Sequence, residues 1–219
     1  DNLAPVTQLF TPHWIVRYLV ENSLGRMWMR SRPSSRLRER MTCYVDQVAG
    51  QQDTGRTVSS VEEVKLLDPA CGSGHMLTYA FDLLYAIYEE EGFPPSSIPE
   101  LILTRNLRGL EIDPRAAQLA SFALAMKARN RDRKFLQRGI QPDIVCIQPI
   151  AFDEIAISQV ADVVATQSRA AGTPVSVEAL TQVLNSFVDA DTFGSLIRVD
   201  AEAAVAIDAA LPALEDKAT

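Results

Sequence analysis

A glycine-containing turn is the clearest candidate for chemistry in this sequence. Residues 68–74 read DPACGSG, so an acidic residue and two glycines follow the apolar run at residues 64–67. Gly72 and Gly74 permit a tight turn and allow a ligand to lie close to the backbone. Asp68 places a carboxylate where a strand ends, the edge at which open α/β sheets bind ligands. A tight turn without a ligand would explain the glycines equally well, because the third glycine of dinucleotide-binding sites is missing.

A second acidic position follows the next apolar run. Residues 109–114 read GLEIDP. Glu111 at the end of a strand can accept hydrogen bonds from both hydroxyls of a ribose, and the neighbouring Ile112 can cover one face of an adenine ring. The alternative for Glu111 is an exposed carboxylate near a helix start, a description that Asp113, directly before Pro114, fits better. Together with the glycine turn, this position favours ribose binding by Glu111.

The cysteines and histidines form no metal-binding or disulfide pattern. Cys43, Cys71 and Cys146 are far apart, and His13 and His75 are isolated from any cluster of ligands. Structural zinc sites require closely spaced cysteine or histidine pairs. We therefore expect no metal centre.

The elements that must hold these residues alternate between strand and helix. Short strands are expected at residues 64–67, 107–112 and 144–147. Helices are expected at residues 75–90 and 98–105 and after residue 113. This alternation is typical of a parallel α/β sheet with right-handed crossovers.

Two flanking regions complete the predicted organisation. Residues 1–63 hold an N-terminal helix, with Thr11 as its N-cap and Pro12 at its first position, and then an arginine-rich irregular segment. Residues 64–150 form the α/β core. Residues 151–219 form a helical extension, broken near residues 172–174 and 193–195.

Composition narrows the functional classes. The net charge of −7 is unlike that of a self-sufficient duplex-binding domain, which carries a basic surface. The arginines within residues 26–40 and the basic residues within 129–138 are better explained as solvated helix ends than as phosphate contacts. No apolar run is long enough for a membrane span, and no signal peptide is evident, so a cytoplasmic protein without membrane contacts is expected.

Three motifs in this order resemble those of amino-group DNA methyltransferases. They are QLFTP at residues 8–12, DPACGSG at residues 68–74 and GLEIDP at residues 109–114. The longer stretches LFTPHWIVRYLVENSLGRMW, DPACGSGHMLTYAFDLLYAIYEEEG and NLRGLEIDPRAAQLASFAL resemble the PglX family of BREX phage-resistance systems. The resemblance is clear over residues 6–129. It implies an incomplete Rossmann-like class I fold that depends on S-adenosylmethionine.

The resemblance also implies roles for individual residues. Glu111 would bind the ribose of S-adenosylmethionine, and Ile112 would contact its adenine. Gln148, or less favourably Asp143, would touch the same adenine after the third strand, although Gln148 departs from the commoner Asp or Asn. The methionine end of the cofactor would be lined by four residues of the glycine turn, Asp68, Ala70, Gly72 and Gly74. Thr11 and Pro12 would close over that end from the first helix.

Two neighbours of the glycine turn are given minor roles. His75 at the start of the following helix is suited to a helper contact with the cofactor carboxylate rather than to general-base catalysis. Cys71 lies inside the turn, which favours packing against the cofactor over a role as a nucleophile.

The motif that would carry out the reaction is missing from the sequence. Adenine methyltransferases of this kind hold the flipped base with an Asn/Asp-Pro-Pro-aromatic turn. The Pro94–Pro95 pair follows Phe93 and precedes Ser96. We therefore predict no catalytic residues in this chain and no methyl transfer by it alone.

The parent enzyme would methylate the exocyclic amine of adenine in DNA and so mark host DNA against phage. It would contact DNA through parts outside this chain, and other phage-defence proteins are further candidate partners. A methyltransferase acting on RNA or protein, or a non-catalytic interaction module with the same fold, stay as alternatives. We also expect the edge of the third strand to be covered by the C-terminal helices or by a second copy in a homodimer.

Overall fold

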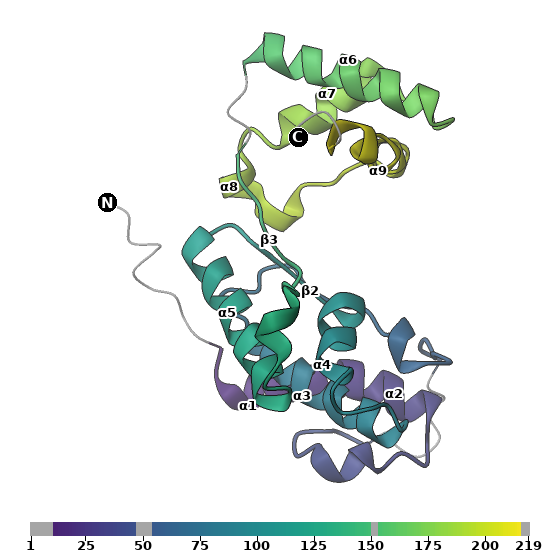
Figure 1. Cartoon of the computed structure of the whole chain (residues 1–219), viewed down its shortest axis with the longest axis vertical. Helices are drawn as coiled ribbons and strands as arrows, with labels where there is room; N and C mark the ends of the chain where they lie inside the picture. The colour runs from purple at the N-terminus through teal and green to yellow at the C-terminus, as the bar shows by residue number, and fades with distance from the viewer. Residues whose placement is uncertain (1–10, 47–53, 150–152, 216–219) are drawn as a thin grey trace. The chain divides into compact units, whose positions relative to one another are not determined.

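The computed structural model describes residues 11–46, 54–149 and 153–215, with the side chains of Asp191 and residues 211–215 left out. The chain divides into two compact units, Asp1–Cys146 and Ile147–Thr219. Figure 1 follows it from the purple N-terminal helices to the yellow helix at the C-terminal end. Residues 8–10, which begin the first motif, lie outside the described ranges.

A small parallel sheet lies in the first unit. Its strands are β1 (Leu66–Asp68), β2 (Leu107–Glu111) and β3 (Ile144–Cys146), in the order β1-β2-β3. Asp68 pairs with Gly109, and Glu111 pairs with Cys146. The predicted strands are therefore present. The first begins at Leu66 rather than at residue 64, because a 3₁₀ turn, Val61–Glu63, precedes it. The chain thus has a mixed helix and sheet architecture, compatible with a methyltransferase-like α/β fold.

Helices fill the rest of the first unit. The predicted helix over residues 75–90 is confirmed, whereas the one expected at residues 98–105 is α-helical only in its first turn and continues as a π-helical segment. The helical segments are α1 (His13–Val20), a π-helical turn (Glu21–Gly25), α2 (Arg26–Ser31), a 3₁₀ turn (Arg36–Arg40), α3 (His75–Glu90), α4 (Ile98–Leu101), a π-helical segment (Ile102–Asn106), α5 (Pro114–Arg131) and a 3₁₀ turn (Phe135–Arg138).

The core of this unit is built around α3. Its side chains Phe81, Leu84 and Tyr88 are fully buried, and the helix packs against α1, α5 and β2. Apolar residues at helical spacing predict such a buried face, because positions three and four apart lie on the same side of a helix. Since α3 begins at the glycine turn, its packing fixes where that turn lies.

The first helix begins one residue later than predicted. Pro12 is the N-cap of α1, with extended backbone angles (φ −54°, ψ 140°), and no side chain in the described part of the chain caps this end. The carbonyl of Pro12 accepts hydrogen bonds from the amides of Ile15 and Val16, at 2.9 and 3.2 Å. Thr11 therefore precedes the helix and its hydroxyl does not cap it, which corrects the prediction.

The arginine-rich segment is more ordered than the prediction of a solvated helix end implied. Arg30 Nη1 donates to the carbonyl of Arg56 at 2.8 Å, and Arg32 Nη2 donates to that of Ser59 at 2.6 Å. Arg38 forms a bidentate pair with Asp46 at 2.9 and 3.1 Å. These arginines attach loops to helices, since a guanidinium offers several donors in a fixed geometry.

The sheet has two edges among the described residues, at β1 and at β3. We expected an unpaired strand edge at the third strand. The order β1-β2-β3 shows that β1 is equally an edge. Coverage of the β3 edge by the C-terminal helices or by a second copy stays a prediction.

The second unit is helical. It contains α6 (Glu154–Ala170), α7 (Val177–Ser186), α8 (Ala190–Phe193), a 3₁₀ turn (Gly194–Leu196) and α9 (Ala201–Glu215). Its small core includes Ala161, Val164, Ala165 and Leu180. Helices end near both predicted breaks, at Ala170 and Phe193.

No helix in the described ranges is both long enough and apolar enough to pass through a membrane.

Candidate functional site

The turn between β1 and α3 bends back toward the sheet. The amide of Cys71 donates to the carbonyl of Leu110 on β2 at 2.9 Å, and the amide of Gly74 donates to the carbonyl of Cys71 at 2.8 Å. Gly72 and Gly74 have φ angles of +52° and +83°, which residues other than glycine rarely adopt. The turn is therefore a defined bend with its backbone held against β2.

The two glycines serve different purposes. A Cβ atom at Gly74 would lie 3.1 Å from the Cα and Cβ atoms of Ala120, so this glycine lets α5 approach the turn. A Cβ atom at Gly72 would meet no atom of the described residues within 4 Å. The turn thus leaves open space beside the backbone of Gly72, and a ligand needs such space to lie against the backbone.

Glu111, at the end of β2, forms a hydrogen bond with the turn. Its Oε2 accepts a hydrogen bond from the amide of Gly72 at 2.6 Å. Its Oε1 accepts from the amides of Ile112 and Asp113 at 2.9 and 3.1 Å. A carboxylate offers about four lone-pair positions, and three are occupied here. Glu111 can accept one further hydroxyl directly, and a second one if a backbone amide gives way.

Asp68 lies at the end of β1, close to Glu111. Burial raises the pKa of the Asp68 carboxyl, the charge of Glu111 raises it further, and a hydrogen bond from the amide of Ala70, at 3.3 Å, opposes the shift. No basic side chain of the described residues pairs with either carboxyl, so this edge of the sheet is suited to a positively charged group.

Cys71 is a packing residue. Burial raises the pKa of its thiol to about 12, and the charges of Asp68 and Glu111 add to the shift. Only the thiolate is a strong nucleophile, so this side chain stays inert near neutral pH. A Cβ atom at Gly109 would lie 3.0 Å from the Sγ of Cys71 and closer still to Ile144 and Leu77, at 2.7 and 2.9 Å, so the glycine on β2 leaves room for these three side chains.

A cavity of about 460 Å³ joins these residues. It brings Thr11, from the first motif, together with Asp68, Ala70 and Gly72 of the second motif and Glu111 of the third. Sequence reasoning did not assign Leu19, Ser73 or Met76, which also line it together with Cys71 and His75. Leu19 lies two helical turns beyond Thr11, so helix periodicity could have indicated it.

Four predicted positions are not among the residues that line the cavity, namely Pro12, Gly74, Ile112 and Gln148. Pro12 caps α1 beside Thr11, and the side chain of Ile112 is 42% exposed and available to a ligand. Gln148 belongs to the second unit, where its amide donates to the carbonyl of Ile147 at 3.2 Å. Its contact with an adenine ring stays a prediction. The alternative, Asp143, precedes β3 at the amino end of the sheet and pairs with Arg108 at 2.6 Å, a position that does not favour it.

His75 follows the turn and shares the cavity wall. Its Nδ1 lies 3.1 Å from the Ser73 hydroxyl, so the two polar side chains flank Gly74 on the same wall. This arrangement agrees with a helper contact to an anionic group at the start of α3, where backbone amides favour negative charge.

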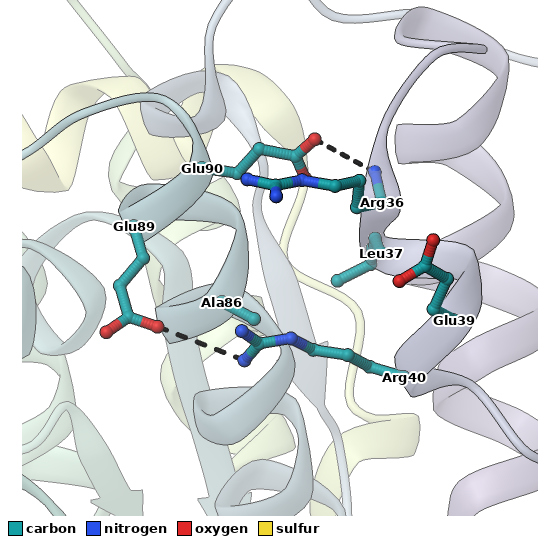
Figure 2. A pocket seen from close by; sticks show the side chains of 7 residues that line it. All are labelled: Arg36, Leu37, Glu39, Arg40, Ala86, Glu89 and Glu90. Atoms are coloured by element: carbon teal, nitrogen blue, oxygen red, sulfur yellow. Dashed lines mark hydrogen bonds and ion pairs between the residues drawn. The ribbon is translucent and has the colours of Figure 1, made fainter.

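A second, smaller cavity of about 200 Å³ lies where the 3₁₀ turn Arg36–Arg40 meets the end of α3 (Figure 2). Glu90 accepts hydrogen bonds from the Ser35 hydroxyl at 2.7 Å and from the Arg36 amide at 2.9 Å, and so caps that turn. Arg40 pairs with Glu89 at 3.9 Å across the cavity. These charges pair with each other, and we interpret this cavity as part of the structural contact.

Among the described residues, no three His, Cys, Asp or Glu side chains gather where they could hold a metal ion.

A family model of known proteins matches just under half of the chain. The family model of the MmeI DNA-methyltransferase domain matches residues 47–152, a range that holds the glycine turn, Glu111 and all three strands.

Two curated relatives are more specific. The chain is 40% identical to the adenine-specific methyltransferase BrxX of Escherichia coli O9:H4 (strain HS), over 98% of the chain and 19% of that protein. It is 36% identical to the adenine-specific methyltransferase PglX of Lacticaseibacillus casei (strain Zhang), over 90% of the chain and 17% of that protein. The chain is a homologue of these enzymes, which confirms the predicted resemblance, and it spans about a fifth of their length.

Proposed function

We propose that this chain is the S-adenosylmethionine-binding portion of an enzyme that methylates the exocyclic amine of adenine in DNA. The observation that carries the proposal is the cavity that brings Thr11, the glycine turn, Asp68 and Glu111 together. The relatives named above are adenine-specific methyltransferases, which supports a methyl donor as the ligand. When bound, the cofactor supplies a methyl group on a positively charged sulfur.

The residues present fit the parts of that cofactor. A volume of about 460 Å³ falls within the range of about 300–1,000 Å³ that is usual for small-molecule sites. The acidic pair Asp68 and Glu111 suits its ammonium and sulfonium charges. Glu111 retains accepting capacity for a ribose hydroxyl, and the exposed Ile112 can cover an adenine face. The open space above Gly72 admits the ligand to the backbone.

The strand order supports a Rossmann-like assignment. Doubly wound sheets have the classic order 3-2-1-4-5-6 and bind ligands at the carboxyl ends of their strands, where the order reverses beside strand 1. The observed order corresponds to the 3-2-1 half. Asp68, at the carboxyl end of β1, therefore lies where such a fold places its ligand.

We further propose that this chain alone transfers no methyl group. The only consecutive prolines, Pro94 and Pro95, follow Phe93 in the turn beyond the end of α3, where the Phe93 ring packs edge-on against Tyr88 at 4.9 Å. The cavity lies at the start of α3. Sixteen helical residues separate the two ends, or about 24 Å at about 1.5 Å per residue, so this pair cannot hold a base beside the cofactor.

The relatives also support a proposal for the larger reaction. We propose that the whole protein methylates adenine in DNA flipped from the duplex, and that it marks host DNA in a BREX-like phage-defence system. The DNA contacts would lie outside this acidic chain. The alternative of a non-catalytic interaction module predicts no cofactor affinity, and so the first experiment separates it from the main proposal.

That experiment is calorimetric titration of S-adenosylmethionine into the chain and into Glu111→Ala. We expect binding by the unchanged chain and a loss of about 1.5–3 kcal/mol in the variant, or about ten- to a hundredfold in affinity. Glu178→Ala, an exposed glutamate of the second unit, is the matched control and should bind normally. Because Glu111 also accepts from the Gly72 amide, Glu111→Gln tests whether an uncharged acceptor suffices. No binding by the unchanged chain would overturn the proposal for this chain.

A further inference from the structure

A buried carboxylate lies outside the cavity. Glu21 is 0% exposed, and it begins the π-helical turn that joins α1 to α2. Burying a carboxylate is costly unless it is hydrogen-bonded, and π-helical turns occur often at functional sites. Glu21 is not among the residues proposed to contact the cofactor, so its burial needs another explanation.

Both oxygens of Glu21 have partners from distant segments. Oε1 accepts a hydrogen bond from the hydroxyl of Tyr79 on α3 at 2.5 Å. Oε2 accepts from the backbone amide of Cys43 at 2.5 Å. One side chain thus joins the π-helical turn to α3 and to the irregular segment that follows residue 40. Hydrogen bonds to a charged acceptor are among the stronger ones in proteins.

Tyr79, on α3, contacts two residues of α1. The Arg17 guanidinium lies 5.8 Å from the centre of its ring, and the His13 ring packs edge-on against it at 6.1 Å. His13, Arg17 and Glu21 are four residues apart, so they form one stripe along α1 and its extension. Burial and the bond to Glu21 raise the pKa of the Tyr79 phenol, which keeps it protonated as a donor.

The next residue reinforces the attachment. The amide of Asn22 donates to the carbonyl of Cys43 at 2.8 Å, and its oxygen accepts from the amide of Val45 at 2.9 Å. Together, Glu21 and Asn22 supply the hydrogen-bond partners that a neighbouring strand would otherwise give to this segment. The attachment is therefore polar and directional rather than a general apolar contact.

This attachment lies just behind the two walls of the cavity. Leu19 on α1, and Thr11 immediately before it, form one wall, while Gly72, His75 and Met76 form the other at the start of α3. Tyr79 is one helical turn beyond His75, and Glu21 is two residues beyond Leu19. The Glu21–Tyr79 hydrogen bond therefore joins the walls at a point outside the cavity.

We propose that Glu21 is a positioning residue for the cofactor, acting through Tyr79 to hold α1 against α3. This inference rests on the proposed function. The proposed roles assign Thr11, in the α1 wall, to the methionine end of the cofactor and Glu111 to its ribose, so Glu21 governs affinity for the methionine end and leaves the nucleoside end unaffected. A role in stability alone would alter binding of both ends equally.

The test measures the affinities of S-adenosylmethionine and adenosine for the unchanged chain and for Tyr79→Phe, a variant that loses one hydroxyl and keeps the ring. We expect about a tenfold loss of S-adenosylmethionine affinity, as for the loss of one hydrogen bond to a charged group, and adenosine affinity within about twofold. Tyr85→Phe is the matched control. Tyr85 lies on the same helix, its ring contacts Phe81 and Arg131, and the variant should bind both ligands normally.

A second measurement covers the case in which a variant is poorly folded. Hydrogen exchange of peptides from α1 and α5 should show faster exchange in α1 alone, for Tyr79→Phe and for Glu21→Gln. Equal loss of both ligands, no loss of either, or faster exchange throughout the first unit would overturn the inference while leaving the proposed function intact. If the unchanged chain binds neither ligand, the proposed function fails and this inference fails with it.

Discussion

At the scale of single residues, the site is defined by acidic groups with different surroundings. Glu111 is held by three backbone amides, whereas Asp68 accepts one long hydrogen bond from Ala70 and is partly buried. Glu111 therefore shapes the turn as well as lining the cavity. Burial disfavours the charged form of Asp68. A bound cation would therefore stabilise the Asp68 carboxylate more than that of Glu111.

This difference predicts a pH dependence of binding. The pKa of Asp68 is raised above its ordinary value of 3.8 by burial and by the charge of Glu111. A cationic ligand requires the ionised carboxylate, so affinity should fall as the pH drops toward the raised pKa. The stability of the unliganded chain depends on pH in the opposite direction. Folded Asp68 binds its proton more tightly than unfolded Asp68, so its contribution to the free energy of unfolding is lost as the pH rises through the folded pKa.

The measurement is titration of S-adenosylmethionine at pH 7 and pH 5. Asp68→Asn should bind roughly tenfold more weakly at pH 7 and should lose the part of the pH dependence that Asp68 causes. The exposed Asp162→Asn should behave like the unchanged chain. Identical pH profiles for the unchanged chain and Asp68→Asn would show that another group is responsible.

At the scale of elements, a buried amide determines where the first strand begins. Asn106 is 2% exposed, and its amide donates to the carbonyls of Val61 and Val64 at 2.9 and 2.8 Å. Its oxygen accepts from the hydroxyl of Tyr88 at 2.9 Å. These bonds hold the chain entering β1 against α3 and the segment before β2, and so they place Asp68 at the correct edge.

Removing this amide should be costly. Asn106→Ala removes hydrogen bonds from the carbonyls of Val61 and Val64 and from the buried Tyr88 hydroxyl, although the Val61 carbonyl still accepts from the Val64 amide at 3.2 Å. We expect the change to destabilise the first unit by about 2–3 kcal/mol. Chemical unfolding followed by tryptophan fluorescence reports on this unit, because Trp14 and Trp28 both lie in it. Asn185→Ala on the surface of α7 is the control and should change the free energy by less than about 0.5 kcal/mol. An equally small effect for Asn106→Ala would contradict this role.

At the scale of the whole molecule, we propose that cofactor binding and methyl transfer are separated. The chain spans about a fifth of the length of its relatives, carries a net charge of −7 and contains no Asn/Asp-Pro-Pro-aromatic sequence. An acidic surface repels the phosphate backbone. These properties support the proposal that the chain holds the methyl donor rather than the DNA.

The corresponding prediction concerns activity. The purified chain, incubated with duplex DNA and S-adenosylmethionine carrying a labelled methyl group, should leave the DNA unlabelled, whereas a full-length relative assayed beside it should label adenine. Label in the DNA that depends on the chain and disappears with Glu111→Ala would refute the separation of binding from catalysis.

Much of this organisation is encoded locally in the sequence. Helix α3 begins and ends where the apolar spacing and the following Gly92 predict, and Asp113 caps α5 by accepting from the Arg115 amide at 2.8 Å. The three motifs were enough to indicate the homologues that comparison then found. Such features depend on neighbouring residues in one turn or strand, so a linear reading recovers them.

Contacts between distant segments needed the folded chain. No local pattern shows that Thr11 shares a cavity with Glu111, that Glu111 accepts from the Gly72 amide, or that Glu21 is buried against Tyr79. The sequence also did not reveal that the arginines attach loops, or that β1 is an edge of the sheet. These depend on how helices and strands pack, because burial and hydrogen-bond partners are set by groups that meet only when the chain is folded.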